Sequence, residues 1–441
     1  MKNVSIFQIV VIVLSALFAI IALILFSTYK GSDEEKINPV TIWGTIDFGV
    51  FKDFQNDILA NEELETDLNH VTYEEIRMEN FNDEFVEALA TGVGPDLVIL
   101  PHNMILLHEN KLLPLSYESY PERLFKDSFI DGADVLRDSN GIYALPIAVD
   151  PLIMYWNKDL FKRKLITEAP NTWETVIDIA PKLSVSNEAG AISKSTVAFG
   201  QFFNVDYPKE IFTTLMQQAG SKIVERQSFE ANDGGFDILT VPVLNKRDNF
   251  LTPPAEAALR FFGQFTDPTR EVYSWNRSLN QDSERFLSGD LAIYFGKTSK
   301  YDDFKKINPN LNFDVAVIPQ KSGAVPVTYA DFTAIGIVKN TQKSTDAFKT
   351  LGVITRPEIA NMLSTALDLP PARRDVLAYP QAEAEKETFF ASAVWAKAFY
   401  DPYPEKTNKI FKDMVELYTS GQVGLSESVG IANQQMEVIF R

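Results

Sequence analysis

An alternation of strand-like and helix-like segments between residues 40 and 100 constrains the fold of this chain most. Three β-rich runs, at 40–43, 71–76 and 96–100, are separated by segments in which apolar residues recur at helical spacing. The third run is continuously apolar, as expected for a strand that is buried on both faces of a sheet. The order predicts an α/β fold with a parallel sheet covered by helices, in which ligands bind beyond the carboxyl ends of the strands.

The length of 441 residues exceeds what one hydrophobic core ordinarily organises, and it predicts two globular domains. Residues 144–156 form a long apolar stretch that contains a single charge, Asp150. A charge in such a stretch needs either a bend between two strands or a buried partner. Residues 224–249 lose periodicity and predict a loop or an irregular hairpin, whereas the C-terminal third is predicted to be mostly helical.

Composition excludes several classes of function. The formal net charge of −19 at pH 7 argues against a nucleic-acid partner, because binding to phosphates requires clustered Lys and Arg. The chain has no cysteine, which excludes disulfides, thiol nucleophiles, Cys-ligated zinc and a lipidated cysteine anchor. The three histidines, His70, His102 and His108, lack the spacing of a metal motif. We therefore expect no metal and no cofactor.

The N-terminal segment predicts a membrane anchor. Residues 4–29 carry no charge, and about 20 consecutive apolar residues in a helix span the hydrocarbon core of a bilayer. A cleaved signal peptide has a shorter apolar region and a small-x-small cleavage site, which is missing here, but cleavage stays open as an alternative. Residues 30–38 are predicted to be a short polar linker.

Several motifs in the globular part resemble family 1 extracellular solute-binding proteins of the maltose-binding type. Residues 140–161 read NGIYALPIAVDPLIMYWNKDLF, and residues 170–174 read PNTWE; the family usually has Tyr where Trp156 stands. Matching segments follow in the family's order at 286–296, 313–319 and 369–377. Each motif is weak alone, but together they cover nearly the whole globular part.

The resemblance implies a periplasmic-binding-protein type II fold, in which two lobes with mostly parallel sheets close over a ligand. Lobe 1 would comprise residues 39–148 and about 330–380, and lobe 2 about 150–328 and 385–441. The implied function is that of an extracytoplasmic receptor, not an enzyme, which captures a sugar or oligosaccharide and delivers it to the permease of an ABC importer. Two alternatives stay open: a ligand-sensing ectodomain for a membrane signalling partner, and a glycosidase that uses two cleft carboxylates.

Candidate ligand contacts follow from the chemistry of sugar sites, which need aromatic faces for C–H surfaces and polar side chains for hydroxyl groups. Asp150 matches the acidic hinge position of maltose-binding proteins, with a structural ion pair as its alternative role. Segment 202–207 is placed at the cleft by position alone. The further candidates are Thr45, Asp47, Asn103, Tyr207, Trp275, Lys297, Tyr329, Asp331, Arg373 and Trp395.

Several of these residues also have a structural alternative. Asp47 and Asn103 follow strand candidates, where helix starts are equally expected. The two tryptophans, Trp275 and Trp395, fit core packing as well as stacking on a sugar ring. For Arg373 a structural role is the more common one.

Overall fold

The structure is a computed structural model that describes residues 38–64, 68–188, 191–231 and 235–440. The predicted anchor at residues 4–29 and nearly all of the linker at 30–38 lie outside the described residues. Within the described ranges, no helix is both long and apolar enough to cross a bilayer. Val40–Arg441 cluster into one compact unit.

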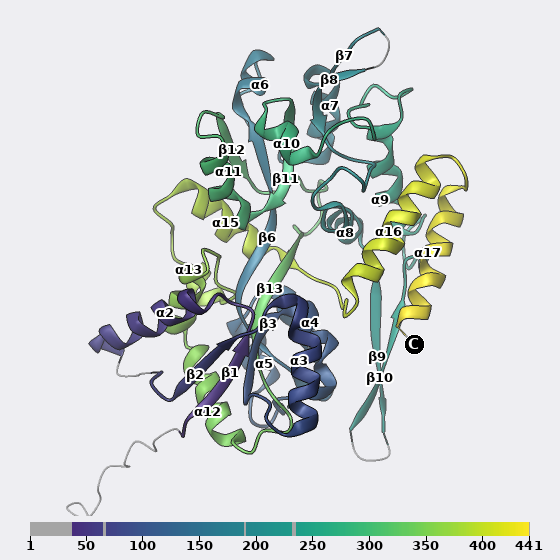
Figure 1. Cartoon of the computed structure of the whole chain (residues 1–441). Helices are drawn as coiled ribbons and strands as arrows, with labels where there is room; N and C mark the ends of the chain where they lie inside the picture. The colour runs from purple at the N-terminus through teal and green to yellow at the C-terminus, as the bar shows by residue number, and fades with distance from the viewer. Residues whose placement is uncertain (1–37, 65–67, 189–190, 232–234, 441) are drawn as a thin grey trace, which may run out of the picture. The chain divides into compact units, whose positions relative to one another are not determined.

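Lobe 1 is built around three parallel strands, β1 (Val40–Gly44), β2 (Val71–Glu75) and β3 (Leu97–Pro101), which confirm the predicted alternation (Figure 1). Helices α2 (Phe48–Ala60) and α3 (Met78–Thr91) cover this sheet with the apolar faces that the sequence spacing predicts. Helix α3 ends at Gly92, whose φ of 77° lies in the left-handed region that a residue without Cβ adopts at little cost.

The other elements of lobe 1 are short or follow much later in the chain. They are α4 (His102–Leu107), η2 (Glu109–Lys111), α5 (Glu122–Ser128), η3 (Asp131–Leu136), β4 (Arg137–Asp138), β5 (Gly141–Ile142), α12 (Ser344–Ile354), α13 (Pro357–Ala366), α14 (Arg374–Leu377) and the turn η1 (Glu62–Leu64).

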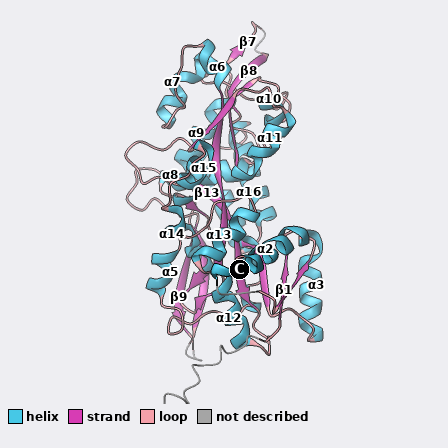
Figure 2. Cartoon of the chain, turned by 90° about the vertical axis from the view of Figure 1, so that its left-hand side faces the viewer, coloured by secondary structure: helices cyan, strands magenta, loops and turns pink. Residues whose placement is uncertain are grey.

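Two long strands, β6 (Leu145–Asn157) and β13 (Thr328–Ile337), connect the lobes (Figures 1 and 2). They pair antiparallel with each other, so that Asp331 lies opposite Asp150. Strand β13 also pairs with β3, and β6 pairs with β11 (Leu291–Lys297), so one ten-stranded sheet runs through both lobes. Eight of its strands follow the order β2-β1-β3-β13-β6-β11-β8-β7, and the short strands β12 (Phe313–Ala316) and β14 (Ala396–Lys397) pair with β6 and β13.

The sheet is mixed, which corrects the expectation of a mostly parallel sheet in each lobe. The pairs β1–β2, β1–β3 and β8–β11 are parallel, but the pairs made by β6 with β11 and β13, and by β13 with β3, are antiparallel. The reason is that the chain enters lobe 2 along β6 and returns along β13, so these two strands run in opposite directions.

Lobe 2 surrounds β8 (Ile192–Val197) and β11. Its largest fully buried side chain is Trp275, within an apolar cluster that also takes Leu152–Trp156 from β6. The remaining elements are α6 (Lys158–Arg163), α7 (Trp173–Leu183), β7 (Val185–Ser186), α8 (Pro208–Ala219), α9 (Pro254–Gly263), η4 (Gln264–Thr266), α10 (Asp282–Leu287), η5 (Thr298–Lys300), α11 (Tyr301–Ile307), β12 (Phe313–Ala316), α15 (Ala384–Val394), β14 (Ala396–Lys397), α16 (Pro404–Thr419) and α17 (Leu425–Ile439).

A regular hairpin of β9 (Val224–Glu230) and β10 (Phe236–Pro242) leaves lobe 2 and reaches lobe 1. The sequence predicted only a loop or an irregular hairpin there. Its strands contact lobe 1 through polar groups: the Ser228 hydroxyl lies 2.5 Å from that of Ser139, and Asn140 exchanges two hydrogen bonds with the backbone of Phe236. A regular hairpin was not predicted because the exposed part of its strands alternates little between polar and apolar residues.

Candidate functional site

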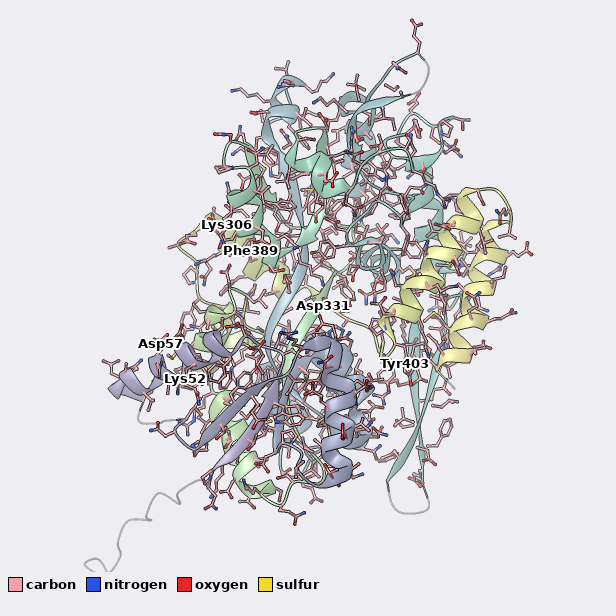
Figure 3. The ribbon with its side chains drawn as sticks, viewed as in Figure 1. Lys52, Asp57, Lys306, Asp331, Phe389 and Tyr403 are labelled. Atoms are coloured by element: carbon pink, nitrogen blue, oxygen red, sulfur yellow. The ribbon has the colours of Figure 1, made fainter. Side chains whose placement is uncertain are left out.

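A polar cavity of about 360 Å³ lies where segments of both lobes meet the crossing strand β13. The start of α4, the start of α8 and the start of α16 bring side chains to it, and β13 supplies Tyr329 and Asp331. Figure 3 shows Asp331 at the level between the two lobes, and Tyr403 at the segment that leads into α16. The position beyond the carboxyl end of β3 is the one that parallel sheets predict for a ligand.

Lysine 297, at the end of β11, holds the centre of an ionic cluster beside the cavity. Its ammonium forms a close ion pair with Asp331 and lies 5.3 Å from the ring centre of Tyr207. Burial lowers the tendency of Lys297 to be charged, but Asp331, Glu210 and Asp150 outweigh it and raise the pKa of Lys297. This lysine is therefore cationic at neutral pH.

Aspartate 331 is held ionised by its neighbours. Burial acts to raise the pKa of its carboxyl group, but Lys297 and His102 nearby, with hydrogen bonds from Lys297 and Tyr329, hold the pKa below its usual value. The Tyr329 hydroxyl donates to Asp331 Oδ1 at 3.0 Å, and Tyr329 is itself almost fully buried. The carboxylate is thus fixed in orientation by two protein donors.

Aspartate 150 is the single charge of the long apolar stretch, and the structure gives it three donors. Its carboxylate accepts from Thr298 Oγ1 at 2.8 Å, Ser299 N at 3.1 Å and Ser299 Oγ at 2.7 Å. Burial raises the pKa of Asp150, while Lys297 and these hydrogen bonds oppose the rise. The carboxylate therefore ties β6 to the turn after β11 through hydrogen bonds, whereas the structural alternative that the sequence offered for it was an ion pair.

Histidine 102 lines the cavity and is only 2% exposed. Its Nδ1 accepts the backbone N–H of Phe332 at 3.3 Å, so the proton of the neutral ring lies on Nε2. Burial lowers the pKa of His102, although Asp331 acts in the other direction. The ring is accordingly neutral at physiological pH and has one N–H donor.

Helix α8 begins at Pro208 and brings Lys209 and Glu210 to the cavity wall. The Lys209 ammonium pairs with Asp401 at 3.1 Å, and both side chains are more than nine-tenths buried. The Thr407 hydroxyl donates to the other oxygen of Asp401 at 2.7 Å. Burial raises the pKa of Glu210, against the opposing effect of Lys297 and Lys209.

The structure brings a subset of the sequence candidates together. Asn103, Tyr329 and Asp331 line the cavity. Lys297 lies beside it, together with its neighbours Asp150 and Tyr207. Several polar wall residues were not among the candidates: His102 as a ligand contact, Lys209, Glu210, Asp401, Glu405 and Asn408. Lys209 and Glu210 could have been found from the sequence, because they follow a proline that is typical of a helix start.

Five candidates lie elsewhere or already have structural partners. Asp47 caps α2 by accepting from Val50 N at 3.1 Å, and Thr45 is half-buried directly after β1. Trp275 is fully buried, with its Nε1 donating to Asn204 at 3.0 Å, which fits the packing alternative. Arg373 binds Asp375 and the Thr355 carbonyl. Trp395 is half-buried after α15, and its carbonyl accepts from Thr328.

Two larger cavities lie elsewhere in the described part of the chain. One of about 560 Å³ lies in lobe 2 along α16, and another of about 650 Å³ lies between η3 and the C-terminal end of α8. The 360 Å³ cavity is the candidate site because it gathers several ionisable side chains with shifted pKa values at the ends of strands and helices. In the ranges that the structure describes, no cluster of three or more potential metal ligands occurs.

Comparison with known proteins gives consistent results. The model of a family described as bacterial extracellular solute-binding protein matches residues 54–391, about three quarters of the chain. A curated relative from Brucella abortus, named as a binding protein, is 23% identical over 271 residues, as is a relative from Brucella suis. The match covers 60% of this chain and 59% of the relative, so the chain spans about three fifths of these relatives.

Solved structures share the fold across nearly the whole chain. A cyclo/maltodextrin-binding protein in complex with maltotetraose is 17% identical, with a TM-score of 0.71 and coverage of 93% of this chain and 99% of that one. A sugar-binding protein from Xanthomonas citri is also 17% identical at a TM-score of 0.71, with coverage of 91% and 97%. A cyclic α-maltosyl-1,6-maltose binding protein from Arthrobacter globiformis is 14% identical at 0.71, with coverage of 92% and 99%. At these identities the likeness shows the two-lobed α/β fold.

Proposed function

The chain belongs to the bacterial extracellular solute-binding protein family, and from that premise we propose that it captures a sugar or oligosaccharide and delivers it to an ABC importer. One observation carries the proposal: the polar cavity lies at the strands that connect the lobes. A solute bound there contacts both lobes, so its binding energy favours the closed form. An importer that contacts both lobes then distinguishes loaded from empty receptor.

The polar character of the cavity supports a hydroxyl-rich solute. Each sugar hydroxyl that leaves water requires a hydrogen-bond partner, since an unpaired one costs about 1–3 kcal/mol. His102, Asn103 and Asp331 offer a donor, an amide and an acceptor at the cavity wall, and Tyr207 adds a half-buried aromatic ring nearby. We assign direct contacts to these residues and to Glu210.

The other candidates take supporting positions in this proposal. Lys297, Tyr329 and Asp150 orient the contact residues. Thr45 and Asp47 follow β1 at the same edge of the sheet as the loop after β3, where a longer oligosaccharide would reach them. Trp275 and Arg373 maintain the folds of their lobes, and Trp395 positions the start of β13.

The membrane arrangement rests on the sequence. The uncharged stretch of residues 4–29 is long enough to span a bilayer, and it would anchor the receptor beside its permease on the extracytoplasmic face. The lobes would comprise residues 39–148 with about 330–380, and about 150–328 with 385–441. Fractionation of cells that express the full chain tests this part: recovery in the soluble extracytoplasmic fraction would contradict an anchor.

Calorimetric titration of the full chain with maltose, maltotetraose and mannotriose tests solute capture. Because the full chain includes the predicted anchor, it is kept in solution with a detergent. The headgroup of this detergent should be neither a sugar nor an ammonium group, since either would compete with the solute for the cavity. Receptor function predicts saturable binding to at least one sugar, with the ligand recovered intact by mass spectrometry. Recovery of shortened sugar would favour a glycosidase instead. If none of the three sugars binds, the proposal is refuted.

A further inference from the structure

The charge balance of the cavity is unequal. Five of the residues that line it carry carboxylates and one carries an ammonium group; the carboxylates belong to Asp206, Glu210, Asp331, Asp401 and Glu405, and the ammonium group to Lys209. Lys297 adds a second cation beside the cavity through its pair with Asp331. The site thus has five carboxyl groups and two ammonium groups.

Both lysines are already committed to protein carboxylates. Lys209 pairs with Asp401, and Lys297 pairs with Asp331. These pairs neutralise two of the five carboxylates, and the exposed side chains of Asp206 and Glu405 are solvated at the rim. Glu210 differs, because it is half-buried in the wall and its carboxylate has no ion pair or hydrogen bond with another residue of the described part of the chain.

Histidine 102 supplies a second observation that indicates a ligand. Its Nδ1 accepts from the backbone, so Nε2 must be the donor, and the hydrogen bonds of the described residues include none from this N–H to a protein acceptor. The side chain is almost completely buried and lines the cavity. Closure of the lobes over a solute would leave this donor unsatisfied unless the solute has an acceptor oxygen.

We propose that the solute carries a cationic nitrogen beside its hydroxyl groups, as in an amino sugar, with Glu210 as the counter-ion of the nitrogen and His102 Nε2 as the donor to a neighbouring oxygen. This inference rests on the proposed function as a sugar receptor. A hydroxyl group of a neutral sugar can donate to Glu210 but brings no charge to balance the carboxylate, whereas an ammonium group forms a charge-assisted hydrogen bond with it and neutralises it. The general acidity of the chain, with a net charge of −19, accounts for Asp206 and Glu405 at the rim but gives no reason for an unpaired carboxylate in the wall.

Paired probes that differ only at nitrogen test the inference. The full chain is titrated at pH 7 with glucosamine, N-acetylglucosamine and glucose, and with the β-1,4-linked glucosamine disaccharide, diacetylchitobiose and cellobiose. We expect the amine form of at least one series to bind at least tenfold more tightly than its acetylated and hydroxyl counterparts. Glu210→Gln should remove this preference by lowering the amine affinity at least tenfold, because the amide side chain carries no charge to balance the ammonium group. Glu358→Gln makes the same change at an exposed position of α13 and should retain the preference.

The outcomes separate this inference from the proposed function. If neutral sugars bind as tightly as amines, or if Glu210→Gln keeps the preference, the inference is refuted and the sugar receptor stands. If the diamine cadaverine binds and no sugar does, sugar capture is refuted. The inference is then refuted as well, because it requires a solute that has hydroxyl groups beside its cationic nitrogen. Loss of all binding in Glu210→Gln, with an unchanged melting temperature, would assign Glu210 to hydroxyl recognition and contradict the counter-ion role.

Discussion

Replacing Arg226 by alanine should destabilise the protein by about 3 kcal/mol, because this side chain joins the hairpin of lobe 2 to lobe 1. Its Nη2 donates to Glu109 at 3.0 and 3.3 Å and to Asp138 at 3.2 Å, and its guanidinium lies 4.2 Å from the ring centre of Tyr400. The Tyr400 hydroxyl also donates to Glu109 at 2.8 Å. Without Arg226, Glu109 and Asp138 lose the one cation that pairs with them among the described residues, within a largely buried cluster.

The structure places the expected magnitude at the lower end of the range for buried ion pairs. Removing one partner of a fully buried pair costs about 3–5 kcal/mol. Here the side chains of Arg226 and Glu109 are 16% and 22% exposed. The Nε and Nη1 atoms of Arg226 have no hydrogen-bond partner in the part of the chain that the structure describes, which offsets part of its contribution. Unfolding about 400 residues has an entropy of roughly 0.8 kcal/mol/K, so about 3 kcal/mol corresponds to about 4 °C in melting temperature.

Thermal unfolding of the full chain, followed by circular dichroism, measures the effect of Arg226→Ala. The matched control is Arg123→Ala, since Arg123 pairs with Asp127 on α5 and is 92% exposed, so its loss should cost less than about 0.5 kcal/mol. Burial raises the pKa of Glu109, and Arg226 opposes the rise. In the variant, the Glu109 carboxylate has lost its cation and destabilises the fold at pH values above the raised pKa of Glu109. The destabilisation should therefore diminish as the pH falls toward 4.5, where Glu109 becomes protonated. Equal losses for the two variants would refute the assignment of Arg226 as the link between hairpin and lobe 1.

Three further predictions concern the site and the core. Asp150→Ala should weaken sugar affinity by about tenfold or more and also lower the melting temperature, whereas Asp150→Asn, which keeps an acceptor oxygen, should lose less of both; calorimetry and thermal unfolding measure the two effects. Amine affinity should fall as the pH is lowered toward 4.5, because burial raises the pKa of Glu210 and protonation removes the counter-ion; equal affinity at pH 7 and pH 4.5 would contradict this. Trp275→Phe should cost about 1–2 kcal/mol in urea unfolding, because Asn204 loses its donor, and should leave sugar affinity unchanged; a loss of affinity would return Trp275 to the site.

The sequence predicted the elements that its periodicity encodes strongly. The three parallel strands of lobe 1 and the crossing strand at Asp150 follow from apolar runs of strand length, and the end of α3 follows from Gly92. The mixed character of the sheet was missed because strand direction depends on where the chain returns, which is a property of the whole fold. For this region the sequence predicted a loop or an irregular hairpin, and the regularity of the hairpin at 224–242 was missed because its exposed residues need not alternate.

The composition of the cavity was predictable only in part. Four segments contribute its walls, near residues 102, 208, 330 and 404, and nothing local to any of them specifies the other three. Lys209 and Asp401 are about 190 positions apart, so their ion pair becomes visible only when α8 and the start of α16 are placed side by side. The sequence could identify polar residues after strands, but it could not tell which ones were already neutralised.

The pairing of β3 with β13 has a consequence for the order of synthesis. Leu97–Pro101 pairs with Thr333–Ile337, so the sheet of lobe 1 lacks its fourth strand until more than 200 further residues have been made. At about 5–20 residues per second this interval lasts roughly 10–50 s. During that time an apolar strand edge is open to incorrect pairing. Export of the nascent chain while it is still unfolded would prevent β3 from pairing incorrectly before β13 has been made.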